Sequence, residues 1–242
     1  LNDTLHADFG SGLYGDYGIP FRMVGRGQNK VPVHFTAYGS ESDRGPYPVP
    51  LGTRIEGGSD NHVIVVQKGS CRLYEMYRAR RGKGRWLADS GAKFDLRSNA
   101  LRPAGWTSAD AAGLPIYPGL AKAGEASNSR INHALRVTVE ESQRGYVDPA
   151  RHFASSSNDR SLPPMGLRLR LKAGYGLSGF SGQALAIMKA MKKYGLIVAD
   201  NGSDWFISGT PDRRWDDDDL DQLKKVPGGA FEAVNTGPVH RD

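Results

Sequence analysis

The feature that most constrains this chain is a series of short apolar runs with a period of two residues. Residues 131–139 (INHALRVTV) and 166–173 (GLRLRLKA) alternate most clearly, and residues 62–67 (HVIVVQ) are rich in β-branched side chains. This period places alternate side chains on the two faces of a β-sheet. Further runs that we interpret as strands occupy residues 31–38, 71–78, 196–200 and 203–208. The pattern predicts a mainly β protein with many short strands.

Turns and two helices are predicted between these runs. Residues 68–70 (KGS) suit a hairpin turn, and Asn201-Gly202 is a stronger hairpin signal because both residues tolerate positive φ. Residues 181–194 have a helical apolar period. Residues 216–226 begin with a run of aspartates and end near two lysines, which suits the helix dipole. The aspartates therefore need no metal to explain them.

Composition and turn content favour one β-rich domain. The chain has 242 residues with 31 glycines and 14 prolines, so it is rich in turns and long enough for a sizeable core. We expect a single antiparallel β-sandwich or jelly-roll domain over residues 1–242, with one or two helices on its flank. Residues 41–58 and 94–120 are expected to be long ordered loops. The sequence contains no run of about 18 apolar residues, so it predicts no membrane-spanning helix.

The segment 94–120 (FDLRSNALRPAGWTSADAAGLPIYPGL) has neither a helical nor a strand period. Its aromatic and apolar residues argue against disorder. Long irregular segments inside compact domains are uncommon, and ordered ones often carry functional groups. We therefore expect this loop to pack over the scaffold and to contribute to a site.

Charge and cysteine content restrict the class of partner only loosely. The formal net charge is +6, from 32 Lys and Arg against 26 Asp and Glu, which is compatible with an acidic polymer, nucleic acid or a membrane surface. The densest basic run, residues 78–85, is short, and we expect no nucleic-acid partner. The single cysteine, Cys71, excludes an intrachain disulfide and is expected to be buried as a small apolar side chain.

Motifs for several enzyme classes are missing. The sequence has no P-loop, no Gly-rich dinucleotide motif, no H-E-x-x-H, no G-x-S-x-G and no Cys/His zinc spacing. These absences lower the prior for nucleotide-using enzymes, zinc peptidases and α/β-hydrolases. We expect neither a metal nor another cofactor.

Two groups of carboxylates are candidates for acid/base chemistry. Glu56, Asp60 and His62 bracket a loop that enters a strand, where a carboxylate and an imidazole could form an acid/base pair or bind a cation through oxygen and nitrogen. The alternative is a turn in which Asp60 bonds its own backbone. Glu75 shares a mostly apolar strand face with Leu73, so it is either paired with an arginine or tuned as a general acid.

Other candidates are cationic or aromatic. His133 is either a core histidine or a catalytic one, and Arg136 points to the opposite face of the same strand. Arg168 and Arg170 belong to a basic stripe that could bind acidic groups or form salt bridges. Tyr146 and His152, close to an arginine, are the groups that a polysaccharide lyase uses.

The loops around Trp106 and Trp205 could stack on sugar rings, although buried tryptophan is commoner. Several aspartates lie in or near these loops, including Asp95, Asp110 and Asp200. A glycosidase needs two carboxyl groups about 5 to 9 Å apart, and sequence spacing cannot select the pair.

Three segments resemble a group of bacterial proteins that are often exported and have no assigned activity. These segments are ESDRGPYPVP, the 94–120 loop and ADNGSDWFISGTPDRRWDDDDL, and the resemblance covers most of the chain. It implies export and a functional role for the 94–120 loop, but no catalytic residue. The sequence also begins at Leu1 rather than at methionine, which indicates processing or trimming, and a removed signal peptide is one explanation.

These observations predict a secreted, carbohydrate-active protein. The leading hypothesis is a glycoside hydrolase that cleaves a polysaccharide through an Asp/Glu pair. The alternatives are a lyase acting on an acidic glycan and a non-catalytic lectin-like module. The predicted catalytic residues are Glu56, Asp60, His62, Glu75, Asp95, Asp110 and His133. The predicted substrate-binding residues are Arg97, Trp106, Arg136, Tyr146, His152, Arg168, Arg170 and Trp205.

Overall fold

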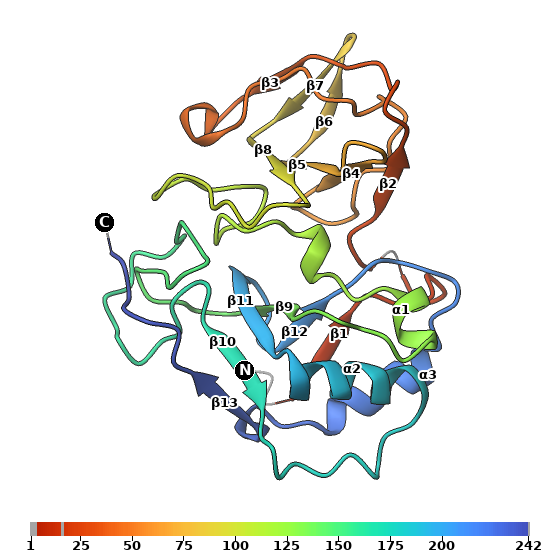
Figure 1. Ribbon diagram of the computed structural model, residues 1–242, viewed down its shortest axis with the longest axis vertical. Coiled ribbons are helices and arrows are strands. Elements are labelled where there is room, and N and C mark those ends of the chain that lie inside the picture. Colours follow the sequence, from red (N-terminus) through yellow and green to blue (C-terminus); the bar gives the residue numbers. More distant parts are fainter. Residues whose placement is uncertain (1–3, 16, 242) are drawn as a thin grey trace.

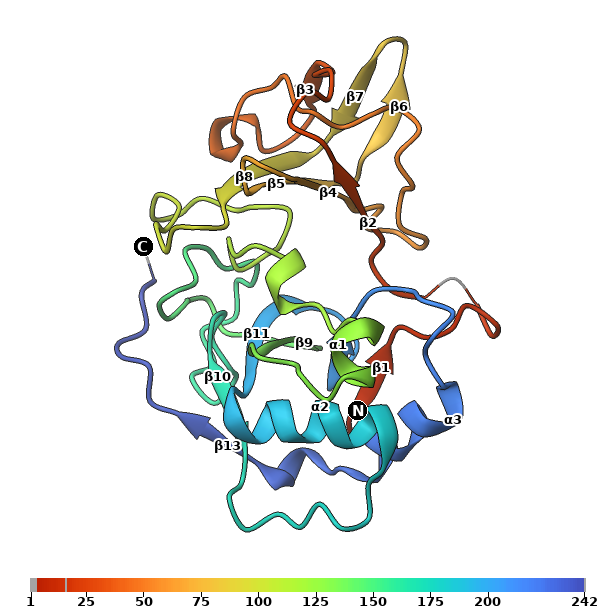
Figure 2. The same ribbon diagram turned by 45° about the vertical axis from the view of Figure 1, so that its right-hand side comes forward.

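A computed structural model describes residues 4–15 and 17–241, and the chain forms two lobes (Figure 1). The N-terminal lobe, residues 20–100, occupies the top of the view and contains no α-helix. The C-terminal lobe is built from the residues before position 20 and after position 120 that the structure describes, and it carries the three α-helices. The connecting loop, residues 101–120, runs between the lobes in both views (Figures 1 and 2).

The N-terminal lobe holds two mixed sheets. The four-stranded sheet has the order β2 (Phe21–Val24), β4 (Val63–Gln67), β5 (Arg72–Tyr77) and β8 (Ser90–Asp95). The three-stranded sheet has the order β3 (Val33–Phe35), β7 (Arg85–Ala88) and β6 (Arg80–Gly82). The antiparallel pair of β4 and β5 confirms the hairpin predicted at residues 68–70.

The four-stranded sheet is buried on both faces, which explains why the first four residues of β4, Val63 to Val66, are all apolar. On one face Val63, Val65, Tyr74 and Met76 pack with Tyr47 and Trp86. On the other face Ile64, Val66 and Leu73 pack with Ile116 and Leu120 of the connecting loop. The connecting loop is therefore ordered because it covers apolar surface that water would otherwise contact.

The C-terminal lobe contains a six-stranded mixed sheet. Its strand order is β1 (His6–Asp8), β12 (Phe206–Ser208), β9 (Leu135–Val139), β11 (Leu196–Asn201), β10 (Arg168–Leu171) and β13 (Phe231–Val234). The helices are α1 (Ala123–Ser127), α2 (Gly182–Lys193) and α3 (Asp217–Leu220). Helix α2 buries Ile187, Met188 and Met191 in the core shared with the sheet. Asp219 of α3 accepts hydrogen bonds from the backbone N–H groups of Gln183 and Ala184, which caps α2.

The prediction of a mainly β protein with few helices is confirmed, but the sandwich or jelly roll is not the architecture observed. Each of the three sheets contains a parallel pair as well as antiparallel pairs, for example β1 with β12 and β9 with β11. Parallel neighbours require crossover connections, which the alternating pattern of a single strand does not reveal.

The hairpin predicted at Asn201-Gly202 is wrong. Strands β11 and β12 lie on opposite sides of β9 instead of pairing with each other. The turn wraps the end of β9, where the Gly202 N–H donates to the carbonyl of Val139. Cys71 also differs from expectation, because it is exposed at the start of β5 with a φ of 50°.

Both crossings between the lobes are fastened at Gly209. On the way into the N-terminal lobe, the Ile19 N–H donates to the Gly209 carbonyl at 2.9 Å. On the way back, Ala121 forms a parallel bridge with Gly209, and its N–H donates to Ser208 at 3.0 Å. The segment just after β12 is thus the common anchor of both connections.

Candidate functional site

Arg136 on β9 organises a buried polar cluster. Its Nη2 donates to an Asp110 oxygen at 2.9 Å and to an Asp200 oxygen at 3.0 Å, and its Nη1 donates to Ser208 Oγ at 2.6 Å. The Arg136 side chain is 7% exposed and that of Asp110 is 1% exposed. Burial alone would lower the pKa of Arg136, but the two carboxylates outweigh it and keep the guanidinium protonated.

Asp200 is held at the open side of this cluster. It belongs to β11, whose register against β9 shifts between Val198 and Asp200, and such bulges commonly re-aim a side chain. Its side chain is 20% exposed. Burial raises the pKa of Asp200, the negative charge of Asp110 raises it further, and Arg136 only partly offsets them, which leaves the pKa at about 7. Asp200 therefore holds its proton to a higher pH than an ordinary aspartate does.

His62 and Glu56 form a second ion pair on the N-terminal lobe. His62 Nδ1 lies 2.5 Å from a Glu56 oxygen, and Nε2 lies 2.9 Å from the Ala109 carbonyl. Because both partners are acceptors, both ring nitrogens must donate, and the ring is an imidazolium. Burial alone would lower the pKa of His62, but Glu56 raises it to about 9. Burial alone would raise the pKa of Glu56, but the hydrogen bonds and charge of His62 lower it.

The two ion pairs meet in the connecting loop. The Ala109 carbonyl bonds His62 of the N-terminal lobe, and the carboxylate of the next residue, Asp110, bonds Arg136 of the C-terminal lobe. We call the six connected side chains the interlobe network. Its members are Glu56, His62, Asp110, Arg136, Asp200 and Ser208.

Solvent reaches the interlobe network from one side. The Glu56 side chain is 14% exposed, and Asp60 and Tyr77 are partly exposed. The Tyr77 ring lies 5.7 Å from that of His62, and burial and the charges of Asp60 and Asp200 raise the pKa of its phenol. Asp8 on β1 is exposed. Partial removal of water from its carboxyl group raises its pKa, and the negative charges of Glu56 and Asp60 raise it further. Glu56, Asp200 and Asp8 thus place carboxyl groups from three segments around one region.

Glu75 lies beneath the interlobe network without any exposed surface. Its carboxylate accepts hydrogen bonds from the Ile116 and Tyr117 N–H groups at 2.9 Å. Burial raises the pKa of Glu75, the backbone hydrogen bonds offset part of that rise, and the pKa is about 7. Because no substrate can touch it, we assign Glu75 to holding the connecting loop on the sheet.

Of the predicted catalytic residues, Glu56, His62 and Asp110 therefore join the interlobe network, with Asp60 at its edge. The other three are elsewhere: Glu75 is buried under the connecting loop, as described above, and Asp95 and His133 lie at separate positions. Asp95 is the last residue of β8, and Ser90, which pairs with Tyr77, is the first, so Asp95 lies at the far end of the strand from Tyr77. Asp95 forms ion pairs with Arg97 and Arg72. His133 binds Glu125 at 3.0 Å, beside α1.

Of the predicted substrate-binding residues, only Arg136 belongs to the interlobe network. Tyr146 is buried and stacks with His240 at a centroid distance of 5.1 Å. His152 bonds the Ala111 carbonyl at 2.7 Å. His133, Tyr146 and His152 thus contact separate partners, and they do not form the arrangement expected for a lyase.

None of the four tryptophans is an exposed stacking platform. Trp86 and Trp215 are buried. Trp106 lies under the Arg102 guanidinium at 5.5 Å, and Trp205 stacks on Phe231 at 5.2 Å. The predicted sugar-stacking role of Trp106 and Trp205 has no support from their exposure.

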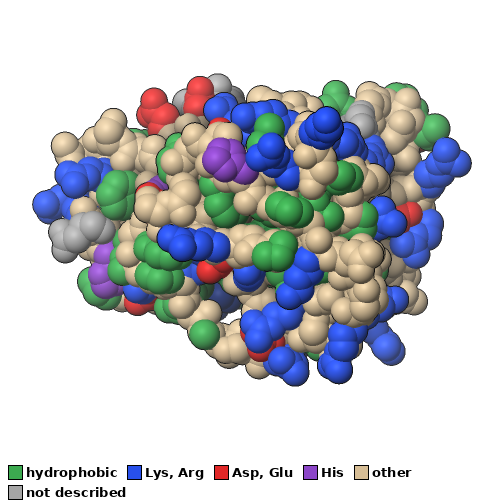
Figure 3. Space-filling model, turned by 90° about the horizontal axis from the view of Figure 1, so that it is seen from above, with side chains coloured by type: hydrophobic (Ala, Val, Ile, Leu, Met, Phe, Trp, Pro, Cys, Tyr) green, Lys and Arg blue, Asp and Glu red, His purple; other side chains and the backbone are tan. Residues whose placement is uncertain are grey.

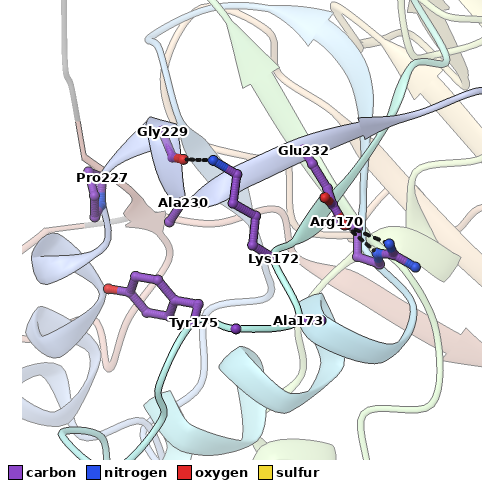
Figure 4. Close-up of a pocket in the computed structure, with 9 residues that line it drawn as sticks. Arg170, Lys172, Ala173, Tyr175, Pro227, Gly229, Ala230 and Glu232 are labelled. Atoms are coloured by element: carbon purple, nitrogen blue, oxygen red, sulfur yellow. Dashed lines mark hydrogen bonds and ion pairs between the residues drawn. The ribbon is translucent and has the colours of Figure 1, made fainter.

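The predicted basic stripe on β10 lines a shallow hollow of about 760 Å³ between β10 and β13 (Figure 4). Arg170 is paired with Glu232 at 2.5 Å, and Lys172 Nζ donates to the Gly229 carbonyl at 2.7 Å. Arg168 donates to the Tyr194 carbonyl at 3.1 Å. Of the two predicted alternatives for this stripe, the structure agrees with internal bonding: Arg170 forms a salt bridge, and Lys172 and Arg168 donate to backbone carbonyls.

The residues that our predicted site omitted are Asp8, Tyr77, Asp200 and Ser208. Asp200 was recognisable as the first acid after an apolar strand, but its partner could not be chosen without knowing that β9 and β11 are neighbours. Among the described residues, no three His, Cys, Asp or Glu side chains are arranged to hold a metal ion. Within the same part of the chain, no helix is long and apolar enough to cross a membrane.

The protein was also compared with known proteins. No protein-family model, no curated protein and no solved structure matches this chain.

Proposed function

We propose that the protein is an exported glycoside hydrolase that acts on a polysaccharide at the interlobe network. The observation that carries this proposal is the contrast between Asp200 and Glu56. Both carboxyl groups reach solvent and both interact with Arg136, yet the pKa of Asp200 is raised to about 7 while that of Glu56 is lowered. Glycosidases use such a pair, in which one carboxyl group donates a proton and the other stays ionised.

In this mechanism Asp200 donates its proton to the glycosidic oxygen as the bond to the leaving sugar breaks. Glu56 remains ionised because His62 holds its charge, and it stabilises positive charge on the sugar ring or activates the attacking group. Arg136 and Asp110 set the proton affinity of Asp200 without touching the sugar, so they are positioning residues.

A lyase acting on an acidic glycan is the second candidate. It is favoured by the Tyr77 phenol, which lies beside His62 and close enough to Asp60 and Asp200 for their charges to raise its pKa. In that mechanism the Tyr77 phenol would transfer the proton.

The test is a degradation screen over neutral and acidic polysaccharides, read by new reducing ends and by ultraviolet absorbance of unsaturated uronates. A hydrolase produces reducing ends without the absorbance, whereas a lyase produces both. We expect Asp200→Asn and Glu56→Gln each to lower kcat by about 100-fold or more. Full activity of both variants would remove the hydrolase mechanism.

Asp95→Asn and Glu232→Gln are matched controls, since each removes one charge from an ion-paired carboxylate outside the interlobe network. Both should retain wild-type kcat. Thermal unfolding of every variant establishes that lost activity does not reflect lost structure.

A further inference from the structure

The N-terminal lobe carries the whole positive surplus of the protein. Residues 20–100 contain fourteen Lys and Arg and seven Asp and Glu, whereas the rest of the chain contains eighteen and nineteen. Exposure separates the two signs further. Thirteen of the fourteen cations in residues 20–100 are exposed, and none of the seven carboxylates is. Figure 3, seen from the end that this lobe occupies in Figure 1, shows Lys and Arg gathered over it and few acidic side chains.

The carboxylates are less exposed than the cations because most of them bond to other groups of the protein. Glu56 binds His62, Glu75 binds backbone N–H groups, and Asp43 binds Arg102 at 2.5 Å. Asp89 accepts from Thr36 at 2.6 Å, and Glu41 accepts from the Thr107 N–H. In this lobe, therefore, most acidic side chains bind other parts of the protein, whereas most basic side chains are exposed to solvent.

The hairpin formed by β6 and β7 concentrates this charge. Arg80, Lys83 and Arg85 are all exposed, and among the described residues no carboxylate lies within ion-pair distance of any of them. Arg81, in the same hairpin, is fixed by the carbonyls of Leu51 and Thr53 and lies over Trp86. The hairpin therefore presents three exposed cations that need not break an ion pair with a described carboxylate to meet an anion.

We propose that the exposed cations of the N-terminal lobe dock an anionic polysaccharide and so deliver an acidic polymer to the interlobe network. As a statement about substrate class, this inference rests on the proposed function. Arginine forms bidentate pairs with carboxylate, sulfate and phosphate, and ten of the fourteen cations are arginines. A surface of one sign also raises the rate at which a polymer of opposite sign arrives.

The surface suits a glycan better than a nucleic acid. Single-stranded nucleic acids are bound by aromatic platforms next to basic grooves, and double-stranded DNA is commonly read by an element that enters a groove. Among Phe, Tyr and Trp, Tyr38 is the only exposed residue in residues 20–100, and the same residues contain no α-helix. The cations lie on short strands and turns, which can follow an extended charged chain without stacking on it.

The test measures binding of fluorescently labelled polygalacturonate and dextran sulfate to the full chain, in an Asp200→Asn background that prevents cleavage. Neutral dextran and DNA in single- and double-stranded form are the comparison probes. We expect at least one acidic polysaccharide to bind, with Kd rising about tenfold or more between about 50 mM and about 200 mM NaCl. Neutral dextran should not bind.

Arg80→Glu/Lys83→Glu/Arg85→Glu should raise Kd about tenfold or more. The control Arg160→Glu/Lys189→Glu/Lys225→Glu changes net charge equally at exposed sites of the C-terminal lobe and should change Kd less than about twofold. Equal losses in the two variants, no binding of either acidic polysaccharide, or tighter binding of DNA at equal charge concentration would each overturn the inference. Binding without hydrolysis in the wild type would refute the proposed function while leaving the docking surface intact.

Discussion

Ala109 and Asp110 are consecutive residues that bond opposite lobes. The Ala109 carbonyl accepts from His62 at 2.9 Å, and the Asp110 carboxylate accepts from Arg136 at the same distance. One peptide unit thus joins the two charged pairs, so a change in either pair acts on the placement of the other. The predictions below separate the contributions of charge, backbone conformation and protonation to this arrangement.

Asp110→Asn should destabilise the protein by about 3 kcal/mol, because it leaves a buried guanidinium with only Asp200 as its charged partner. Denaturant unfolding at neutral pH measures the change. Asp95→Asn is the control, since Asp95 pairs with an exposed arginine on the surface, and it should leave the unfolding midpoint unchanged. Equal midpoints for the two variants would contradict a buried charge pair.

The His62–Glu56 pair should give stability a defined pH dependence. The folded pKa of His62 is about 9, above its ordinary value of 6.5, so its contribution is complete below about pH 6.5 and is lost as pH rises through about 9. The stability difference between wild type and His62→Gln should therefore shrink by up to about 3 kcal/mol over that interval. A difference that stays constant between these pH values would mean that His62 is not an imidazolium in the folded protein.

Two glycines of the connecting loop offer a matched test of its packing. Gly113 has a φ of 70°, and a Cβ there would lie 2.5 Å from the Trp106 carbonyl oxygen. Gly105 has a φ of 77° but nothing within 4 Å of its Cβ position. Gly105→Ala should cost about 1 kcal/mol from backbone strain, and Gly113→Ala should cost more because the carbonyl must also move. Thermal unfolding compares them, and the reverse order would contradict the close approach.

Activity should fall as pH rises through about 7, where Asp200 loses its proton. Since the pKa of Glu56 is lowered, the acidic limb should begin below the ordinary pKa of 4.5 for a glutamate. The dependence of kcat on pH, measured on whichever polysaccharide the screen identifies, gives both limbs. Asp110→Asn removes the negative charge that raises the pKa of Asp200, and it should move the alkaline limb to lower pH. An unmoved limb would assign the acid to another group.

Local chemistry made part of this structure predictable. The alternating runs located β4, β5, β9 and β10, and helix α2 followed its apolar period. Glu56 and His62 could be proposed as a pair because only a short loop separates them. Strand neighbours could not be predicted, because the period of one strand says which face is buried but not which strand lies beside it.

Two elements show why the remainder was missed. Strand β6 lies within a run of arginine, lysine and glycine that lacks the apolar alternation of a strand, and β7 begins at the end of that run. The two strands form through pairing of β7 with β6 and with β3. The contact of Arg136 with Asp200 depends on β9 and β11 being parallel neighbours with a bulge. Both features come from tertiary arrangement, which outweighs local preference.

The two crossings that converge on Gly209 lie next to Ser208, which accepts a hydrogen bond from Arg136. The strand end that carries both connections therefore also carries one member of the interlobe network. A change of backbone conformation at residues 208–210 would alter both connections and the surroundings of Arg136 together.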